Sequence, residues 1–488
     1  MKTKLILTTF IISHSIFSIA QTESSAFTLT GKGVATPFAT DYHSLGINPA
    51  NLDLPSLYEG KKVTIGFAEI AVSLYSEALT KEEVRQNLFN EEVEELSYQE
   101  QIAFAQEFAS TATAIDADVM AFGFALKTDS IGGFGFSIRD RAHYYSELGP
   151  KVSEIGILGY TADYFDFLVL MSGDTIANDG SFNPDTMDIK LGYTELANAL
   201  NIRELIEGTH VKMSWTREFN FGYGKLLLSG DDWGIYAGVG LKYLLGYGMI
   251  KVDAEGGEVV AFTATSPIFD IDYSDEATAS NPSSLPEGSG NFTPVGKGLG
   301  FDLGLTYLFD TKYRLSAAIT DIGGMTWDGN LYTASELPLL EYENGGIESI
   351  DFVDQLTQLN GSDGILQWEG ASEYKTKLPT AGRIGFGYQH GELISVGVDL
   401  VVPLNDDVGS LKRMSLAIGG DIAPVKWLRL SLGVLQGGNY DFKIPAGVTL
   451  VVGNGTWEGG VASRDMVTFF TENQPTLSLS TGFLRFRF

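Results

Sequence analysis

Hydrophobic and polar residues alternate with a period of two along most of the chain, which is the pattern of β-strands that have one apolar face. The clearest run covers residues 235–247, where every second residue is apolar. Such lengths suit tilted strands that cross a bilayer, which takes about 9 to 11 residues. Fourteen strands are predicted, near 62–75, 114–127, 131–142, 208–227, 233–248, 298–309, 313–323, 381–389, 393–402, 413–423, 427–436, 442–452, 456–462 and 476–488.

The connections between these strands alternate between short and long. Tight turns follow the even-numbered strands, whereas the first four odd-numbered strands are followed by the long segments 76–113, 143–207, 249–297 and 324–380. Outer-membrane barrels have this alternation, with periplasmic turns and longer external loops. We therefore predict an all-β fold, a transmembrane antiparallel β-barrel of about 14 strands with long helical or irregular external loops. Thr80 and Glu83 form a capping box that predicts helix within 81–110.

Charge supports this topology. The chain has 62 acidic and 32 basic residues, and the four long segments together contain 38 of the acidic residues and 9 of the basic ones. The acid therefore lies where water is expected. Such a negative chain repels phosphate backbones, so nucleic acid is excluded as a partner. Cysteine is absent, which excludes disulfides, thiolate nucleophiles and cysteine-ligated metals.

The N-terminus predicts export. Residues 1–20 combine two lysines, an apolar run of about 15 residues and small residues before Gln21, which is typical of a signal peptide and short for a spanning helix of ~20 residues. No later apolar run is long enough to span a membrane as a helix. We expect an integral outer-membrane protein with both termini periplasmic, in contact with outer-membrane lipid and lipopolysaccharide.

The C-terminal strand has two different faces. Leu484, Phe486 and Phe488 share one face and Arg485 and Arg487 share the other. This pattern, with a terminal aromatic residue, resembles the signal that the barrel-assembly machinery recognises. Leu477 and Leu479 have the opposite parity, which predicts a bulge near Gly482.

Two motifs carry a family resemblance. Gly31-Lys32-Gly33-Val34-Ala35, then Asp41 and Leu45-Gly46-Ile47-Asn48-Pro49-Ala50-Asn51-Leu52, resembles the N-terminal box of FadL-type fatty-acid transporters and PorV-like secretion components. The stretch Gly300 to Trp327 resembles an uncharacterised outer-membrane barrel family of Bacteroidota.

The resemblance implies how the chain is organised. Residues 21–60 would form a plug or hatch, with the motif residues Gly31, Gly33, Asn48, Pro49 and Ala50, inside a barrel formed by 61–488. A hydrophobic ligand would enter from outside. The acidic insert at 81–110 and the oversized loops depart from the fatty-acid transporters, so the substrate class stays open.

Chemical signatures are sparse. The chain has neither a His-Glu-x-x-His motif nor a Gly-x-Ser-x-Gly motif. Asp140 with His143 is the nearest approach to a catalytic pair, and a polar cluster with Arg139 and Arg141 is the alternative. The acidic run that starts at Asp270 lacks the glycine and the final glutamate of an EF-hand. We expect no catalytic residue, no resident metal and no cofactor.

The segment Ile155 to Met171 is an apolar patch in an external loop. It must pack inward on the plug, line a hydrophobic entry site or bind a partner. Tyr164, Phe165, Phe167 and Leu168 are the candidate ligand-binding residues. The leading hypothesis is a passive outer-membrane transporter or channel for a hydrophobic small molecule. The alternative is a structural or secretion-associated barrel whose acidic external loops dock partner proteins at the cell surface.

Overall fold

The computed structural model describes residues 26–488, except 81–96, 181–183, 272, 274, 335–337, 347–364, 439, 468–469 and 471–475. The expected signal peptide and most of the helical insert predicted at 81–110 lie outside the described residues.

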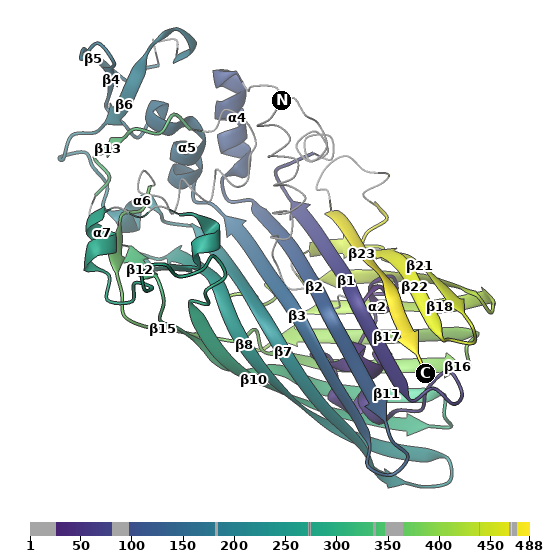
Figure 1. Ribbon diagram of the computed structural model, residues 1–488. Coiled ribbons are helices and arrows are strands. Elements are labelled where there is room, and N and C mark those ends of the chain that lie inside the picture. Colours follow the sequence, from purple (N-terminus) through teal and green to yellow (C-terminus); the bar gives the residue numbers. More distant parts are fainter. Residues whose placement is uncertain are drawn as a thin grey trace, which may run out of the picture.

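A closed antiparallel β-barrel forms the body of the molecule (Figure 1). Each of its strands pairs with the next along the chain, and the last strand pairs with the first over Thr64–Tyr75 and Thr476–Arg487. The predicted fold class and the fourteen predicted strands are confirmed. The strands are β1 (Val63–Ser76), β2 (Ala112–Lys127), β3 (Gly133–Glu147), β7 (His210–Ser229), β8 (Trp233–Glu255), β10 (Gly296–Phe309), β11 (Tyr313–Trp327), β16 (Ala381–His390), β17 (Ile394–Pro403), β18 (Ser415–Val425), β19 (Leu428–Gly437), β21 (Ala446–Val452), β22 (Trp457–Ser463) and β23 (Thr476–Arg487).

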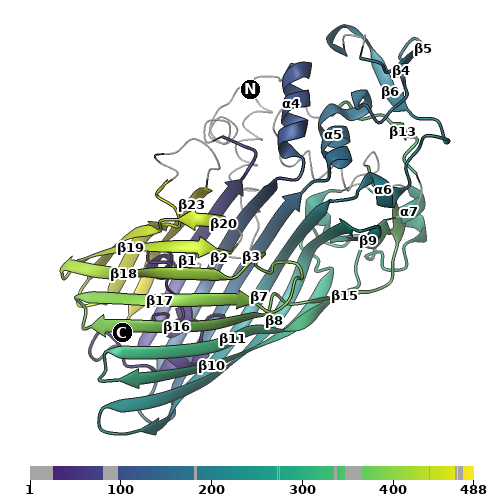
Figure 2. The same ribbon diagram turned by 180° about the vertical axis from the view of Figure 1, so that it is seen from behind.

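The two ends of the barrel differ as the sequence predicts. The tight turns gather at one end, here called the turn end, and the long connections gather at the opposite loop end (Figures 1 and 2). The wall is also uneven in height, because β7 and β8 have 20 and 23 residues whereas β21 and β22 have 7 each.

The outer face of the wall is apolar. Along β10, Phe301, Leu303 and Leu305 are about half exposed, whereas Asp302 and Thr306 between and beside them are buried. A polar interior with exposed aliphatic and aromatic side chains outside is the arrangement of a barrel that faces lipid. In the described part of the chain, no helix combines the length and apolarity needed to cross a bilayer. The apolar outer face and the polar interior are those of an outer-membrane type of barrel.

The predicted bulge in the last strand is present. Phe483 and Leu484 are both exposed, while Gly482 before them and Arg485 after them are buried. The pairing of β22 with β23 shifts register at this point. The bulge reverses the parity of the strand, so that the apolar residues on both sides of it face outward.

Residues 26–58, the N-terminal segment, lie inside the barrel, where α2 is enclosed by strands in both views (Figures 1 and 2). Most of its residues are buried. It contains the helix α2 (Phe27–Thr30) and two 3-10 helices, η1 (Asp41–Ser44) and η2 (Pro49–Asp53).

The long connections build a cap over the loop end of the taller wall. Its core is one cluster of buried apolar residues, from Phe104 and Ile155 in the cap to Trp215 in β7. The cap contains more strand than the predicted helical or irregular loops. Its helices are α4 (Tyr98–Phe108), α5 (Pro150–Leu158), η3 (Gly159–Thr161), η4 (Pro184–Thr186), α6 (Ile202–Leu205), η5 (Pro267–Phe269) and α7 (Asp275–Ser280). Its strands are a small sheet of β4 (Phe167–Leu170), β5 (Thr175–Ala177), β6 (Ile189–Tyr193) and β13 (Glu341–Tyr342), and β9 (Glu258–Thr265), β12 (Leu331–Ala334), β14 (Trp368–Gly370) and β15 (Tyr374–Lys377). A further strand, β20 (Tyr440–Lys443), extends the barrel sheet beside β19.

Candidate functional site at the turn end of the barrel

Glycines of the barrel wall seat the Asn48-Pro49-Ala50 turn. A Cβ atom on Gly304 of β10 would lie 2.0 Å from Asn48 Oδ1, and one on Gly238 of β8 would lie 2.3 Å from the Ala50 nitrogen. Only a residue without a side chain leaves room for the turn at these two places. The Asn48 carboxamide accepts a hydrogen bond from the Ala50 N–H at 3.2 Å and so caps η2.

The Gly31-Lys32-Gly33 motif lies against the opposite, shorter wall. A Cβ atom on Gly31 would lie 2.8 Å from the Gly447 Cα, and Gly33 has a left-handed backbone with φ +71°. The Lys32 ammonium forms a buried ion pair of 2.5 Å with Asp421 of β18. All five predicted motif residues therefore contact the barrel wall or shape the segment that does.

Backbone groups of the segment are also held by the wall. The N–H groups of Ala35 and Thr36 both donate to one carboxylate oxygen of Asp399, each at 2.8 Å. The Asn48 amide donates to the Thr306 hydroxyl at 2.9 Å. Hydrogen bonds to a charged group, such as the two that the Asp399 carboxylate accepts, contribute about 1.5–3 kcal/mol each. The position of the segment on the wall is therefore specific.

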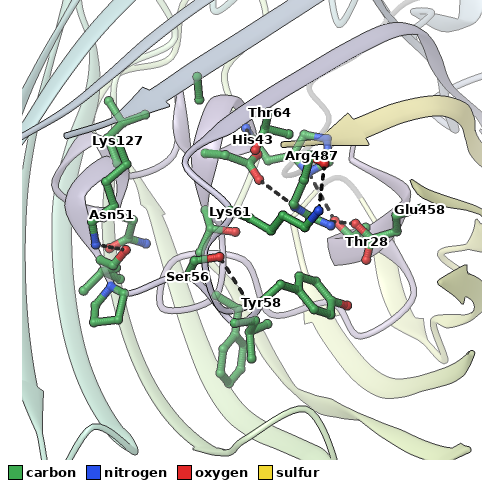
Figure 3. A pocket seen from close by; sticks show the side chains of 18 of the residues that line it. Thr28, His43, Asn51, Ser56, Tyr58, Lys61, Thr64, Lys127, Glu458 and Arg487 are labelled. Atoms are coloured by element: carbon green, nitrogen blue, oxygen red, sulfur yellow. Dashed lines mark hydrogen bonds and ion pairs between the residues drawn. The ribbon is translucent and has the colours of Figure 1, made fainter. Parts of the chain in front are cut away.

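A buried charge network joins the segment to the first and last strands. Arg485 of β23 donates to Asp41 of the segment and to Glu458 of β22, both at 2.6 Å. Arg487 also donates to Glu458, at 2.8 Å (Figure 3). The alternating pattern of the C-terminal strand predicts that both arginines face the interior, and there both donate to the Glu458 carboxylate.

A second buried contact lies nearby. His43 Nε2 is 2.6 Å from a carboxylate oxygen of Glu69 in β1, and the Tyr42 hydroxyl donates to the other oxygen at 2.6 Å. Glu69 follows Ala68, whose backbone φ is +51°, and Phe67 and Ala68 are both exposed. The alternation of inward and outward residues is thus reversed at Ala68, which places Glu69 on the inner face, next to the segment.

Two chambers adjoin the segment at the turn end. The small chamber, of about 90 Å³, lies between the segment and the ends of β1, β2, β22 and β23 (Figure 3). The large chamber, of about 680 Å³, is bounded by Pro55, Ser56 and Leu57 and by the β10–β11, β16–β17 and β18–β19 turns. Arg314 and Arg429 line both chambers.

The chambers reverse the charge balance of the chain. Ten lysines and arginines line them, against four aspartates and glutamates, although acidic residues outnumber basic ones 62 to 32 in the whole sequence. The cations are Lys32, Lys61, Lys62, Lys127, Lys312, Arg314, Lys426, Arg429, Arg485 and Arg487, and the acids are Asp41, Glu392, Asp421 and Glu458.

Several of these cations are satisfied by neutral oxygens. Lys61 donates to the Thr456 hydroxyl at 2.7 Å, Lys127 to the Leu54 carbonyl at 2.8 Å, and Arg314 to the Pro37 carbonyl at 3.2 Å. Arg429 donates to the Tyr58 hydroxyl at 3.3 Å. Charge counted by segment does not reveal this group, because these cations lie near the ends of strands that meet only in the closed ring.

The four predicted ligand-binding residues lie elsewhere, in the cap. Tyr164, Phe165 and Leu168 are buried in or beside its apolar core, and Phe167 is partly exposed in β4. Phe165 stacks on Tyr342 with ring centroids 6.1 Å apart. They line neither turn-end chamber. Most apolar residues of this loop pack in the cap core, and among the described residues that core contains none of the N-terminal segment, so packing on the plug is not what the structure shows. Binding of a ligand or of a partner stays a prediction.

Burial and hydrogen bonds shift the pKa values of two groups in the cap, Tyr164 and Asp166. Burial raises the pKa of the Tyr164 hydroxyl, which donates to the Leu339 carbonyl at 2.7 Å. The Glu195 N–H and the Asn198 amide hold the pKa of Asp166 below its usual range. Asp166 therefore stays charged as it ties the small cap sheet to the next loop.

The pair Asp140 and His143 is not assembled. The two side chains point to opposite faces of β3, and Asp140 instead forms an ion pair with Arg217 at 3.0 Å. Arg141 faces the interior and donates to Glu218 at 2.9 Å, and Arg139 lies 3.2 Å from Asp118. Arg139 and Arg141 thus form a buried ionic layer inside the barrel, so the expected cluster of these arginines with Asp140 at the rim is not what the structure shows. In the described residues, no group of three or more potential ligands could hold a metal ion.

Comparison with solved structures finds other barrels. The toluene transporter TodX of Pseudomonas putida is 11% identical, with 97% of this chain and 99% of that chain covered and a TM-score of 0.40. The toluene transporter TbuX of Ralstonia pickettii is 11% identical, with coverage of 96% and 99% and a TM-score of 0.43. A FadL homologue of Pseudomonas aeruginosa is 10% identical, with coverage of 96% and 98% and a TM-score of 0.40.

A FadL homologue is thus among the structural neighbours. Closeness to a Bacteroidota family stays a prediction. No curated protein matches the chain. A family model described as "Family of unknown function (DUF5723)" matches residues 61–454, from the start of the barrel through most of its strands. The chain therefore belongs to the DUF5723 family.

Proposed function

We propose that this outer-membrane barrel passively admits a hydrophobic small molecule, and that residues 21–60 are its plug. The turn end would face the periplasm together with both termini, and the acidic cap would face outside. Residues 1–20 would be the signal peptide that directs export.

The observation that carries the proposal is the large chamber beside the N-terminal segment. Its volume of about 680 Å³ falls within the range of roughly 300–1,000 Å³ of small-molecule sites. Leu57 of the segment, Leu308 and Leu428 contribute apolar side chains to its lining. A molecule that passed the segment would therefore find a partly apolar space before the periplasm.

The glycine seats support the role of a plug. The wall glycines at 238 and 304 leave room for the segment, and buried ion pairs at Lys32 and Asp41 hold it. Because the segment is held by noncovalent contacts and is not a strand of the wall, its displacement would break these contacts and open a path while the strand pairing that closes the barrel remains.

A reversible lock tests the proposal. A Cβ atom on Gly33 would lie 3.5 Å from the Ala417 Cβ, within the range of about 3.5–4.5 Å for a disulfide. Because the chain has no native cysteine, Gly33→Cys with Ala417→Cys can be oxidised and reduced cleanly. We expect oxidation to abolish uptake of labelled fatty acid or toluene into proteoliposomes, and reduction to restore it.

The single variants Gly33→Cys and Ala417→Cys are the matched controls, and their uptake should not respond to oxidation. Equal uptake by the oxidised and reduced double variant would show that the segment need not move. Absence of uptake by the wild type would remove the transport function itself.

One observation favours the second candidate, a structural or secretion-associated barrel. Phe165 lies in the cap core and Leu168 is buried. Such packing is expected if structured loops seal the barrel. The acidic external loops would then dock a basic partner protein at the surface. Wild-type protein that takes up no apolar probe but retains a partner in cross-linked cells would favour this candidate.

A further inference from the structure

We propose that the large chamber at the turn end is a binding site for a small organic anion, one with a compact apolar body and a carboxylate or phosphate group. The site would hold the anionic group between Arg314, Arg429 and Lys426. Binding does not depend on transport, so the inference goes beyond the proposed function.

The first argument is local charge. Four lysines and arginines line the large chamber, against a single acidic residue, Glu392. Lys312 is paired with Asp310 of its own turn, which leaves Arg314, Lys426 and Arg429 as the cations that face the space. A concave site with cations on its wall concentrates anions because its low-dielectric walls focus the field.

Arg314 is the second argument. Its side chain is 5% exposed, its Nε has no hydrogen-bond partner, and its donation to the Pro37 carbonyl at 3.2 Å is the contact that holds it. A buried charge without a carboxylate partner is costly. Since Arg314 lines the chamber, an anion there would supply the missing partner.

Arg429 lines the same chamber. Its guanidinium donates to the Tyr58 hydroxyl at 3.3 Å, a long contact with a neutral oxygen, and Glu458, Asp421 and Glu392 act on it electrostatically. Arginine forms its strongest hydrogen bonds with carboxylate or phosphate, often through two parallel N–H groups. Arg314 thus supplies the uncompensated charge, and Arg429 adds a second guanidinium to the wall of the same space.

The rest of the lining decides the body of the ligand. Leu57, Leu308, Leu393, Leu428 and Val451 contribute apolar surface to the chamber. A bare inorganic anion would leave this surface wet, whereas an aromatic or branched carboxylate would cover it. The size of the space, about 680 Å³, favours a small molecule over a folded partner.

Equilibrium binding of 2-naphthoate to the full chain in phosphatidylcholine nanodiscs tests the inference, with 2-naphthamide as the uncharged match. We expect the amide to bind at least about tenfold more weakly, because it lacks the charge that the arginines recognise. Binding of the naphthoate should also weaken as NaCl is raised.

The variants locate the site. Arg314→Gln should weaken naphthoate binding at least about tenfold, and Arg314→Lys, which keeps the charge, should recover part of it. Lys426→Gln tests the site without a change in the buried wall, since Lys426 is exposed on its turn. Lys225→Gln is the matched control, because Lys225 is a half-buried turn-end lysine that lines neither chamber.

Equal binding of naphthoate and naphthamide would overturn the inference, as would unchanged naphthoate binding in both Arg314→Gln and Lys426→Gln. Binding of an acidic hexaglutamate peptide in place of naphthoate would also overturn it, in favour of a protein partner. Naphthoate binding without uptake would leave this inference standing and count against the transport proposal, so the two failures are distinguishable.

Discussion

Asp41 and Arg485 are 444 positions apart in the chain and lie 2.6 Å apart in the structure, at the place where the N-terminal segment meets the last strand. Arg485 is 2% exposed and shares its guanidinium between Asp41 and Glu458. The contact joins the segment to the seam where β23 closes the ring on β1. Placement of the segment and closure of the barrel are therefore coupled.

Asp41→Asn should lower the stability of the closed barrel. Removal of one partner from a buried ion pair costs about 3–5 kcal/mol where the other charge is left without compensation; because Arg485 keeps its contact with Glu458, we expect a smaller loss here. The midpoint of heat-induced unfolding, read from the gel shift of folded and unfolded barrel, should fall clearly.

Asp129→Asn is the control for this prediction. Asp129 pairs with Lys62 at the surface, where both side chains are at least half exposed, and such pairs contribute about 0–1 kcal/mol. Equal midpoints for Asp41→Asn and wild type would show that the network around Arg485 adds nothing to stability.

Gly304→Val should unseat the N-terminal segment. A Cβ atom at this position would lie 2.0 Å from Asn48 Oδ1 and 2.9 Å from the Pro49 ring, whereas valine itself suits a strand. The barrel should still form, with higher single-channel conductance in planar bilayers and faster proteolysis within residues 26–58.

Gly290→Val is the matched control, since nothing lies within 4 Å of a Cβ atom there. Its conductance should equal that of the wild type. Deletion of residues 26–58 should raise conductance at least as much as Gly304→Val, and an unchanged conductance in the deletion would exclude a plug.

The bulge in β23 gives the third prediction. Deletion of Leu484 leaves one outward residue where the structure has two, so strict alternation returns and Arg485 and Arg487 still face the interior. Deletion of Phe486 places Arg487 directly after the inward Arg485, so Arg487 would turn toward lipid, where a charge costs up to about 2–4 kcal/mol. We expect the Phe486 deletion, but not the Leu484 deletion, to assemble poorly, measured by the folded fraction in outer membranes; equal folded fractions for the Phe486 deletion and the wild type would contradict this.

Phe483→Leu keeps the parity and should assemble like the wild type. Normal assembly of the Leu484 deletion would mean that the register of β22 with β23, which shifts at this bulge, can readjust at little cost.

Local physics determines which parts of this structure can be predicted from the sequence. Every wall residue faces either lipid or the interior, so the period of two along β10 or β17 is enough to place a strand. The parity of Leu479 against Leu484 was likewise enough to predict a bulge near Gly482, which the structure confirms.

Contacts between distant segments follow no such local rule. No pattern in the sequence pairs Gly304 with Asn48, because that contact depends on how the segment crosses the interior. The short strands of the cap, such as β5 with three residues, have no room to show a period. The chamber cations were detectable by one signal: Lys127, Arg314 and Arg429 all lie next to tight turns.

The last prediction concerns the cap. Phe165 is 1% exposed and stacks on Tyr342, whereas Phe167 is partly exposed on the small sheet. Phe165→Ala should destabilise the cap core, since loss of a buried phenylalanine costs about 3–5 kcal/mol, and should speed cleavage of the cap by added protease. Phe167→Ala should have a smaller effect on cleavage.

Uptake separates a structural role of this loop from a role in ligand binding. If Phe167 touches ligand, Phe167→Ala should reduce uptake of labelled fatty acid while the cap stays resistant to protease; loss of both phenylalanines should weaken ligand binding about tenfold or more. Full uptake by the double variant, at equal amounts of barrel on the cell surface, would remove Ile155–Met171 from the ligand path. The apolar patch would then serve only to hold the cap together.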